Sequence, residues 1–347
     1  MPLSRYLNNP VLTREDIPTI LPHLSDVTSV FNPGAVFHDG RFKLLLRVQT
    51  RGRRTHLLMA EGLDWVRFQV SDRLVELQGL EQVSDEVYHV YDPRITRIEH
   101  RYYIMVAMDT ASGCRLGVAR TDDFVTFDFL GVTEHLGAGE SEDRTSSGQD
   151  DEKSSDAIAA SNDVRNGVLF PERFSGKYLR LERPNTVQPT GAPPTGRHIV
   201  LSESTDLLHW RPMATVMSGR DHYWDELIGS GPPPVKTRAG WLHVYHGIAT
   251  HFGSTNIYQA GAVLLDLEDP ARVLARTRDN ILEPRRPYEL MGQVPNVVFP
   301  SGWIVENHDD AGFADLASRV FLYYGAADTC IGLAICRVRD LIAACQA

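Results

Sequence analysis

The chain has 347 residues, of which 42% are hydrophobic and 23% are charged, values typical of a globular protein with a large core. Its formal net charge of −10 argues against nucleic acid or an anionic membrane as the main partner. No apolar run approaches the ~20 residues of a membrane span, and the first residues carry no apolar signal segment, so we expect a cytoplasmic protein.

The cysteines and histidines show no pattern typical of a bound metal. The four cysteines are scattered without a CxxC spacing, which suits a reducing compartment where thiols fill the core. None of the 13 histidines stands at a ligand-like spacing from another histidine or a cysteine. We therefore expect no metal site and no cofactor.

The chain begins with a segment that we expect to be irregular and continues with short strands. Residues 1–29 contain four prolines and are predicted to form an N-terminal arm. Residues 31–37 and 41–49 flank an Asp-Gly turn, which predicts a β-hairpin. In its second strand, alternation places Arg47 on the same face as Leu45.

A carboxylate stands between an aromatic residue and a proline in Tyr91-Asp92-Pro93, ahead of an apolar, β-prone run at residues 95–108. Proline disfavours the helical region for the residue before it, so we expect Asp92 to be extended and to stand at the entrance of a strand. An aspartate that caps a turn is the alternative interpretation of these residues alone.

A weak internal repeat indicates a repetitive β-fold. A small or polar residue, an aspartate and an aromatic residue recur at residues 61–65, 121–124 and 202–210. The spacing is typical of β-propeller blades with insertions, and a pair of β-sandwiches is the second choice. Strands follow one another without helices between them, which argues against an α/β fold. We predict an all-β fold in which only the last residues, 339–347, are helical.

Two segments interrupt the β-pattern without dividing the chain. Residues 137–160 are rich in Ser, Gly, Asp and Glu, and carry seven acidic residues against two basic ones. They are predicted to form a mobile surface insertion. Residues 186–196 form a second, proline-rich loop. Because the same β-pattern resumes after each, we predict a single domain over residues 1–347.

Isolated polar residues beside apolar strand segments are the candidates for chemistry. Three arginines, a histidine and an asparagine occupy such positions: Arg47, Arg165, Arg183, His246 and Asn32. A single arginine at a strand end is usually a surface residue, and a single histidine on an apolar face usually belongs to the core. If they converge on a propeller axis, they form a site for a tetrahedral oxyanion, because arginine matches phosphate geometry and stays charged when desolvated.

Motifs along nearly the whole chain resemble glycoside hydrolase family 130, the inverting β-mannoside phosphorylases. In chain order they are Phe31-Asn32-Pro33-Gly34, Leu45-Leu46-Arg47-Val48, Tyr91-Asp92-Pro93-Arg94, Leu169-Phe170-Pro171-Glu172, Ser204-Thr205-Asp206-Leu207-Leu208-His209-Trp210, Tyr245-His246-Gly247, Pro295-Asn296-Val297-Val298-Phe299-Pro300 and Tyr323-Tyr324-Gly325-Ala326-Ala327-Asp328-Thr329. Each motif is weak alone, and the resemblance rests on their order.

The resemblance implies a five-bladed β-propeller with the site in its central funnel. It implies that Asp92 is the sole catalytic acid, with a proton that travels through the mannosyl 3-hydroxyl to the glycosidic oxygen. It also implies inorganic phosphate as co-substrate. Phosphate would be bound by Arg47, Arg165, Arg183 and His246 with Asn32 beside them, and the sugar would be contacted by Tyr91, Asp328 and Arg94.

One acid suffices for phosphorolysis. An inverting hydrolase needs a second carboxylate, about 6.5–9.5 Å from the acid, to activate water. Phosphate is already an anionic nucleophile, so a phosphorylase needs a cationic cradle instead. The sequence therefore favours phosphorolysis to α-mannose 1-phosphate. Glu172, Asp225 and Glu226 lie near family motifs and could serve as a base, so a β-mannosidase on the same scaffold remains an alternative. A non-catalytic carbohydrate-binding propeller is the third.

The sequence does not identify the sugar on the acceptor side of the substrate. Residues 137–160 and 186–196 fall between family motifs, and residues 251–258 are not diagnostic. We expect a β-mannoside oligosaccharide with a β-1,4 linkage, and β-1,2 is the alternative. A homo-oligomer that uses the N-terminal arm as a contact is compatible with the sequence.

Overall fold

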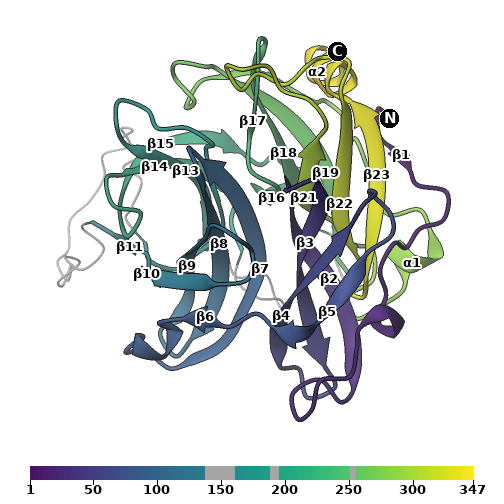
Figure 1. The fold of residues 1–347 in the computed structure, drawn as a ribbon. Coiled ribbons are helices and arrows are strands. Elements are labelled where there is room, and N and C mark those ends of the chain that lie inside the picture. The colour runs from purple at the N-terminus through teal and green to yellow at the C-terminus, as the bar shows by residue number, and fades with distance from the viewer. Residues whose placement is uncertain (137–160, 188–194, 251–254) are drawn as a thin grey trace, which may run out of the picture.

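The computed structural model describes residues 1–136, 161–187, 195–250 and 255–347, whose strands form five mostly antiparallel sheets around a centre (Figure 1). This confirms the predicted all-β fold and the five-bladed propeller, and the sandwich pair is wrong. The acidic insertion at residues 137–160, most of the loop at 186–196 and the first part of 251–258 lie outside the described residues.

The blades follow one another along the chain, and the innermost strands of blades 1, 2 and 3 are β2, β7 and β12. Blade 1 contains β2 (Val27–His38), β3 (Arg41–Thr50), β4 (Thr55–Gly62) and β5 (Gln69–Leu74). Blade 2 contains β7 (Val87–Ile98), β8 (Arg101–Thr110), β9 (Gly113–Thr121), β10 (Phe127–Val132) and β6 (Leu77–Gln78). Blade 3 contains β12 (Val164–Leu169), β13 (Tyr178–Pro184), β14 (His198–Ser204), β15 (His209–Ser218) and β11 (Glu134–His135).

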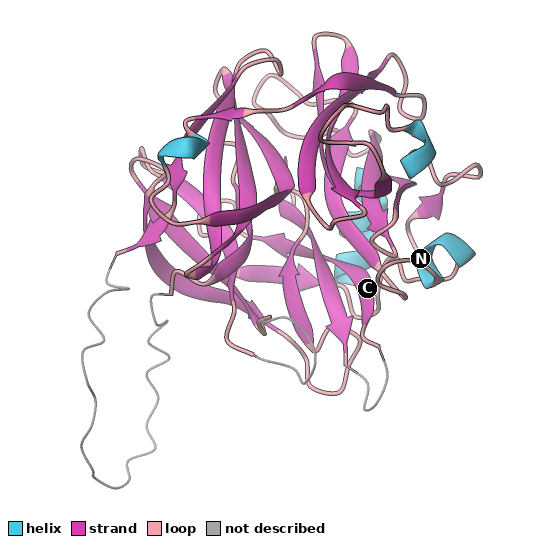
Figure 2. Ribbon diagram, turned by 90° about the horizontal axis from the view of Figure 1, so that it is seen from below, coloured by secondary structure: helices cyan, strands magenta, loops and turns pink. Residues whose placement is uncertain are grey.

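The last two blades complete the ring. Blade 4 contains β16 (Leu227–Ser230), β17 (Val235–Thr237), β18 (Gly240–Ala249), β19 (Ile257–Leu265) and β20 (Val273–Arg276). Blade 5 contains β21 (Val298–Val305), β22 (Arg319–Ala326), β23 (Cys330–Arg337) and β1 (Ser4–Arg5). Strands dominate the described chain, and its few helices are short (Figure 2): η1 (Arg14–Asp16), η2 (Leu80–Gln82), α1 (Pro287–Leu290) and α2 (Val338–Gln346). Among the described helices, none has the length and apolar character needed to cross a membrane.

The N-terminal arm closes the ring. Its strand β1 pairs with β23 at the edge of blade 5, and the amide of Tyr6 donates to the carbonyl of Leu333 at 2.9 Å. Farther along the arm, Leu12 forms a β-bridge with Ile331. Blade 5 is therefore built from both ends of the chain, and β1 already pairs with a strand of its own molecule.

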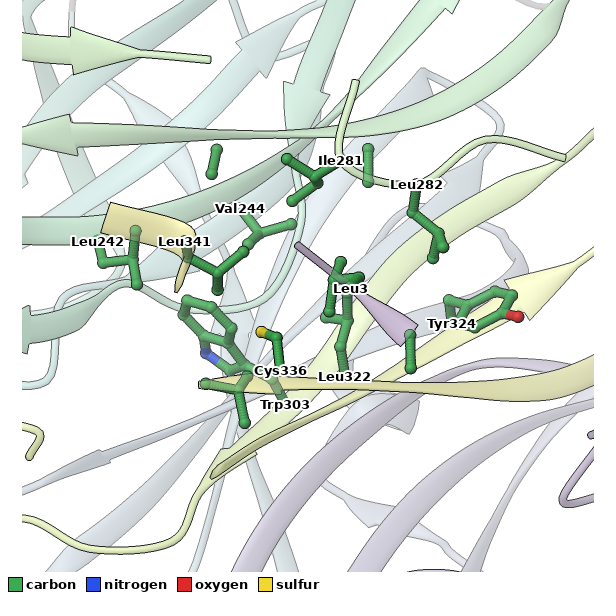
Figure 3. Close-up of a cluster of buried hydrophobic side chains, with 14 of the residues drawn as sticks. Leu3, Leu242, Val244, Ile281, Leu282, Trp303, Leu322, Tyr324, Cys336 and Leu341 are labelled. Atoms are coloured by element: carbon green, nitrogen blue, oxygen red, sulfur yellow. The ribbon is translucent and has the colours of Figure 1, made fainter. Parts of the chain in front are cut away.

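Apolar side chains fill each of the five junctions between neighbouring blades. Strand alternation assigns them to their junctions: Leu44 and Leu46 pack toward blade 5, whereas Leu45 packs toward blade 2. At the junction of blades 4 and 5, Leu3 of the arm lies among buried side chains that include Leu322 (Figure 3). Each fully buried leucine contributes about 2 kcal/mol of hydrophobic stabilisation.

The aspartate of the internal repeat caps the turn that leads into the last long strand of a blade. Asp64, Asp123 and Asp206 each accept hydrogen bonds from backbone amides two and three residues farther along. The repeat therefore precedes that strand. In blade 4, Asp266 makes the same turn, with a bond from the Glu268 amide at 2.9 Å. No aromatic residue follows it closely, so the pattern missed this copy.

Candidate active site

Equivalent β-bulges in the inner strands of blades 1, 2 and 3 aim polar side chains at the centre of the ring. The register of β2, β7 and β12 shifts at Asn32, Asp92 and Asn166, each of which is followed by proline or glycine. These three residues have φ angles of 47°, 52° and 55°, in the left-handed region that asparagine and aspartate tolerate best. The expectation that Asp92 is extended at a strand entrance was wrong. The bulge inside β7 outweighs the preference imposed by Pro93 and redirects the carboxylate.

In blades 1, 3 and 4, the strand next to the innermost one carries a cationic or imidazole side chain at the level of the bulges. Arg47 pairs with Phe31 in blade 1, and Arg183 pairs with Arg165 at the equivalent position in blade 3. In blade 4, His246 pairs with Gly229. Residues far apart in the sequence are therefore brought to the same level of blades 1, 3 and 4.

These residues surround a cavity of about 350 Å³. Seven of the nine residues expected at the site line it: Asn32, Arg47, Tyr91, Asp92, Arg165, Arg183 and Asp328. The other two, Arg94 and His246, are buried and do not appear among its lining residues. The expected sugar contact from Arg94 does not fit its position, because Nε donates to the carbonyl of Gly231 at 2.9 Å and Nη1 to that of Asp92 at 3.2 Å. Arg94 instead supports the bulge.

The candidate acid is held between two blades. Asp92 Oδ1 accepts hydrogen bonds from Asn32 Nδ2 at 3.0 Å and from Arg47 Nη1 at 2.9 Å. The Arg47 guanidinium lies between the rings of Phe31 and Tyr91, at 4.4 and 4.5 Å from their centroids. Burial acts to raise the pKa of Asp92, but the charges of Arg47 and Arg94 and the two hydrogen bonds outweigh it and lower the pKa. The carboxylate is therefore ionised in this arrangement.

A second carboxylate in the cavity has the opposite character. Asp328 follows β22 with a φ of 49° and shares the electrostatic neighbourhood of Arg47 and Asp92. Burial raises the pKa of Asp328 to about 6; the Asp92 charge adds to the rise, and Arg47 opposes it. Two aspartates on one arginine thus have pKa values shifted in opposite directions.

Asp109 joins two of the expected site residues. Its Oδ1 accepts from the Tyr91 hydroxyl at 2.7 Å and from Arg165 Nη2 at 3.2 Å. The Arg165 Nε also points at Cys114 Sγ, 3.0 Å away. Asp109 was not predicted from the sequence, because an aspartate near a strand end resembles any polar surface residue. Within the described ranges, no three His, Cys, Asp or Glu side chains gather as metal ligands do.

Arg183 is a buried cation without an acidic partner among the described residues. It is 5% exposed; its Nη2 donates to Asn185 Oδ1 at 3.1 Å, and its Nε has no partner. Burial and the nearby Arg165 charge lower the pKa of Arg183 to about 10. His246 lies against Phe299, with ring centroids 4.6 Å apart, and burial together with Arg183 and Arg94 lowers its pKa well below the ordinary value. The arrangement is suited to an anion.

The three carboxylates considered as alternative bases do not line the described part of the cavity. Glu172 accepts from Lys236 Nζ at 2.6 Å. Asp225 is fully buried and accepts from Arg220 and the Tyr245 hydroxyl, each at 2.8 Å. Glu226 accepts from the hydroxyl of Thr250. Their contacts assign structural roles to these carboxylates.

The structure adds residues that the sequence analysis did not select. Arg53, Asn166, Tyr258 and Phe299 line the cavity beside the expected set. Asn166 had a recognisable signal, since Asn166-Gly167 forms the same kind of bulge as Asn32-Pro33. Arg53, Tyr258 and Phe299 come from a turn, the start of a strand and a different blade, and no bulge motif marks them in the sequence.

Known proteins are similar to this chain in sequence and in fold. A family model described as beta-1,4-mannooligosaccharide phosphorylase matches residues 6–347. The β-1,4-mannooligosaccharide phosphorylase of Ruminococcus albus is 30% identical over 97% of this chain and 89% of its own length. The 1,2-β-oligomannan phosphorylase of a Thermoanaerobacter species is 31% identical over 94% of this chain and 97% of its own. A β-1,2-mannobiose phosphorylase structure from Listeria innocua has a TM-score of 0.75 at 23% identity, covering 100% of this chain and 99% of that one, and supports the fold. The chain therefore belongs to glycoside hydrolase family 130 and is an enzyme of the glycoside phosphorylase class.

Proposed function

We propose that the protein catalyses the inverting phosphorolysis of a β-mannoside, yielding α-mannose 1-phosphate and a shortened sugar. The observation that carries the proposal is the buried guanidinium of Arg183 beside Arg165. A buried charge without a counter-ion is unfavourable, so the pair favours binding of an anion. Arginine forks match the oxygens of phosphate, and the family and its curated relatives support phosphate as that anion.

In this proposal Asp92 is the acid and phosphate is the nucleophile. Phosphate on the Arg165–Arg183 pair attacks the anomeric carbon while the glycosidic carbon–oxygen bond breaks. The leaving oxygen takes a proton that originates at Asp92 and passes through the mannosyl 3-hydroxyl. The negative charge of the bound phosphate opposes the effect of Arg47 and Arg94 on Asp92, which raises the pKa of Asp92 and lets it carry that proton. No general base is required.

The remaining lining residues position the sugar and the anion in our proposal. Asp328, which lines the cavity together with Arg47, accepts hydrogen bonds from hydroxyl groups of the terminal mannosyl unit. Tyr91 presents its ring to the same unit, because its hydroxyl is already bonded to Asp109. His246 is too buried to touch the anion directly, and we assign it the role of a neutral support behind Arg183.

The experiment that tests the function is product analysis with and without phosphate. Relatives of nearly equal identity act on β-1,4 and β-1,2 linkages, so the substrates are β-1,4-mannobiose, β-1,2-mannobiose and mannosyl-N-acetylglucosamine. We expect ³¹P and ¹H NMR to detect α-mannose 1-phosphate only when phosphate is present, and the fastest substrate to identify the linkage. Free mannose released at the same rate in both tubes would overturn the proposal in favour of a hydrolase.

We also propose a cytoplasmic location. The four cysteines are unpaired in the structure, which supports a reducing compartment. Inorganic phosphate is the only co-substrate that the proposed reaction requires.

A further inference from the structure

The N-terminal arm is tied to helix α1 through one buried carboxylate. Glu289 of α1 is fully buried, and Arg5 of β1 donates to it from Nε at 2.6 Å and from Nη2 at 2.9 Å. The Tyr324 hydroxyl of β22 donates to Oε1 at 2.7 Å, and the backbone amides of Arg285 and Arg286 donate to Oε2. The arm, α1 and blade 5 therefore meet at Glu289, with α1 beside the arm at the edge of that blade (Figure 1).

The segment that follows α1 forms one wall of the active cavity. Val294 and Val297 of this segment line the cavity. The Val297 amide donates to the backbone carbonyl of Glu289 at 3.1 Å, and the Val297 carbonyl accepts from the Ala327 amide at 3.0 Å. The Val294 amide donates to the Ala327 carbonyl at 3.2 Å. Hydrogen bonds therefore connect the arm to the residue immediately before Asp328.

The turn that carries Asp328 needs such support. Ala327 and Asp328 have φ angles of 47° and 49°, a left-handed conformation that is unfavourable for alanine in particular. Two such residues in succession persist only where their surroundings hold them. The segment after α1 packs closely against them, because a Cβ on Gly292 would clash with the carbonyl of Ala327 and with Thr329 Oγ1. This contact fixes the direction of the Asp328 carboxylate, which lines the cavity.

We propose that Arg5 is a positioning residue for the sugar site: through Glu289 it holds the segment after α1 against the turn of Asp328 and so sets the affinity for the terminal mannosyl unit. This inference deepens the proposed function and rests on it, since that function assigns the mannosyl unit to Asp328. Arg5 is not among the described residues that line the cavity. The proposed phosphate ligands Arg165 and Arg183 belong to blade 3, so the arm affects one substrate and not the other.

The test measures the Michaelis constants for both substrates in Arg5→Met. Methionine keeps most of the length of the side chain but donates no hydrogen bond to Glu289. We expect KM for the β-mannoside that the wild type cleaves to rise about fivefold or more, and KM for phosphate to stay within about twofold of the wild type. Arg5→Lys keeps the charge but not the fork and is expected to lie between Arg5→Met and the wild type.

A second variant disturbs the same contact without removing a charge. The Cβ of Gly292→Ala separates the segment after α1 from the turn of Asp328, and we expect the same selective rise in KM for the β-mannoside. Arg319→Met is the matched control: it removes a two-bond ion pair with Glu306 at the start of β22, the opposite end of the strand from Asp328. Both Michaelis constants should stay unchanged in this control. Thermal melts under assay conditions show which variants are folded.

The two proposals fail in different ways. Equal rises in both Michaelis constants, or an unchanged KM for the β-mannoside, in folded Arg5→Met or Gly292→Ala would overturn the role of the arm. If Arg5→Met does not fold, Gly292→Ala and Arg5→Lys decide by the same criterion. A wild type that releases free mannose without phosphate would overturn the proposed function instead, and KM for the β-mannoside would still report the effect of Arg5.

Discussion

Arg47 and Asp92 form an ion pair of 2.9 Å between neighbouring blades, and the same arginine lies near Asp328. The pair joins a side chain from β3 to one from β7, so it exists only when blades 1 and 2 are correctly docked. It lowers the pKa of the proposed acid in this arrangement. An anion that competes for Arg47 would weaken this ion pair and allow the pKa of Asp92 to rise.

Replacing Asp92 by asparagine tests the acid. Asparagine keeps the shape of the side chain and tolerates the left-handed backbone but carries no transferable proton. We expect Asp92→Asn to lower kcat by about 10²–10⁴-fold, while phosphate still raises the melting temperature by mass action. Asp122→Asn, which alters an exposed carboxylate in blade 2, is the control and should retain full activity. Activity of Asp92→Asn within a few-fold of wild type would contradict the role.

Arg183→Met tests the anion site through both stability and binding. The substitution removes a buried charge that has no described acidic partner, so the phosphate-free protein should be equally or more stable in thermal melts. The KM for phosphate should rise at least about tenfold, because a charge-assisted fork is lost. Arg197→Met, at an exposed salt bridge, is the control. An unchanged KM for phosphate in Arg183→Met would exclude this guanidinium from the anion site.

The raised pKa of Asp328 predicts that the stability of the folded protein depends on pH. Its pKa rises from an ordinary 3.8 to about 6, so the folded state binds more protons than the unfolded state between these values, and stability falls as the pH rises through them. Two pKa units correspond to about 3 kcal/mol.

Asp328→Asn should therefore match the wild type near pH 4 and exceed its free energy of unfolding by about 3 kcal/mol at pH 7. Denaturant melts at the two pH values measure the difference. Asparagine suits the φ of 49°, so backbone strain does not confuse the result. A constant difference between the variant and the wild type across this range would refute the raised pKa.

Gly325→Ala tests the support of the acid by Asn32. A Cβ at Gly325 would clash with Asn32 Oδ1 and approach the backbone nitrogen of Asn32 to 3.1 Å. The Asn32 side chain must therefore move and lose its hydrogen bond to Asp92. We expect kcat to fall about tenfold or more, the effect of losing one hydrogen bond to a charged group. Gly52→Ala, in an open turn with φ outside the left-handed region, is the control. Wild-type kinetics in Gly325→Ala would mean that Asn32 does not contribute.

Local sequence patterns are enough to predict the β-architecture and most of the members of the site. Alternation of apolar residues, aspartate-capped turns and the motifs around Asn32, Asp92 and Asp328 are local features, and each acts within a few residues of chain. The assembled fold brings Arg47 to Asp92 and Asp109 to Arg165, and it leaves Arg183 with no described carboxylate. It also decided the left-handed backbone of Asp92, where the bulge in β7 outweighed the preference imposed by Pro93. Pairing across blades depends on ring closure and on the register of strands that lie far apart in the chain, and neither is encoded in a local pattern.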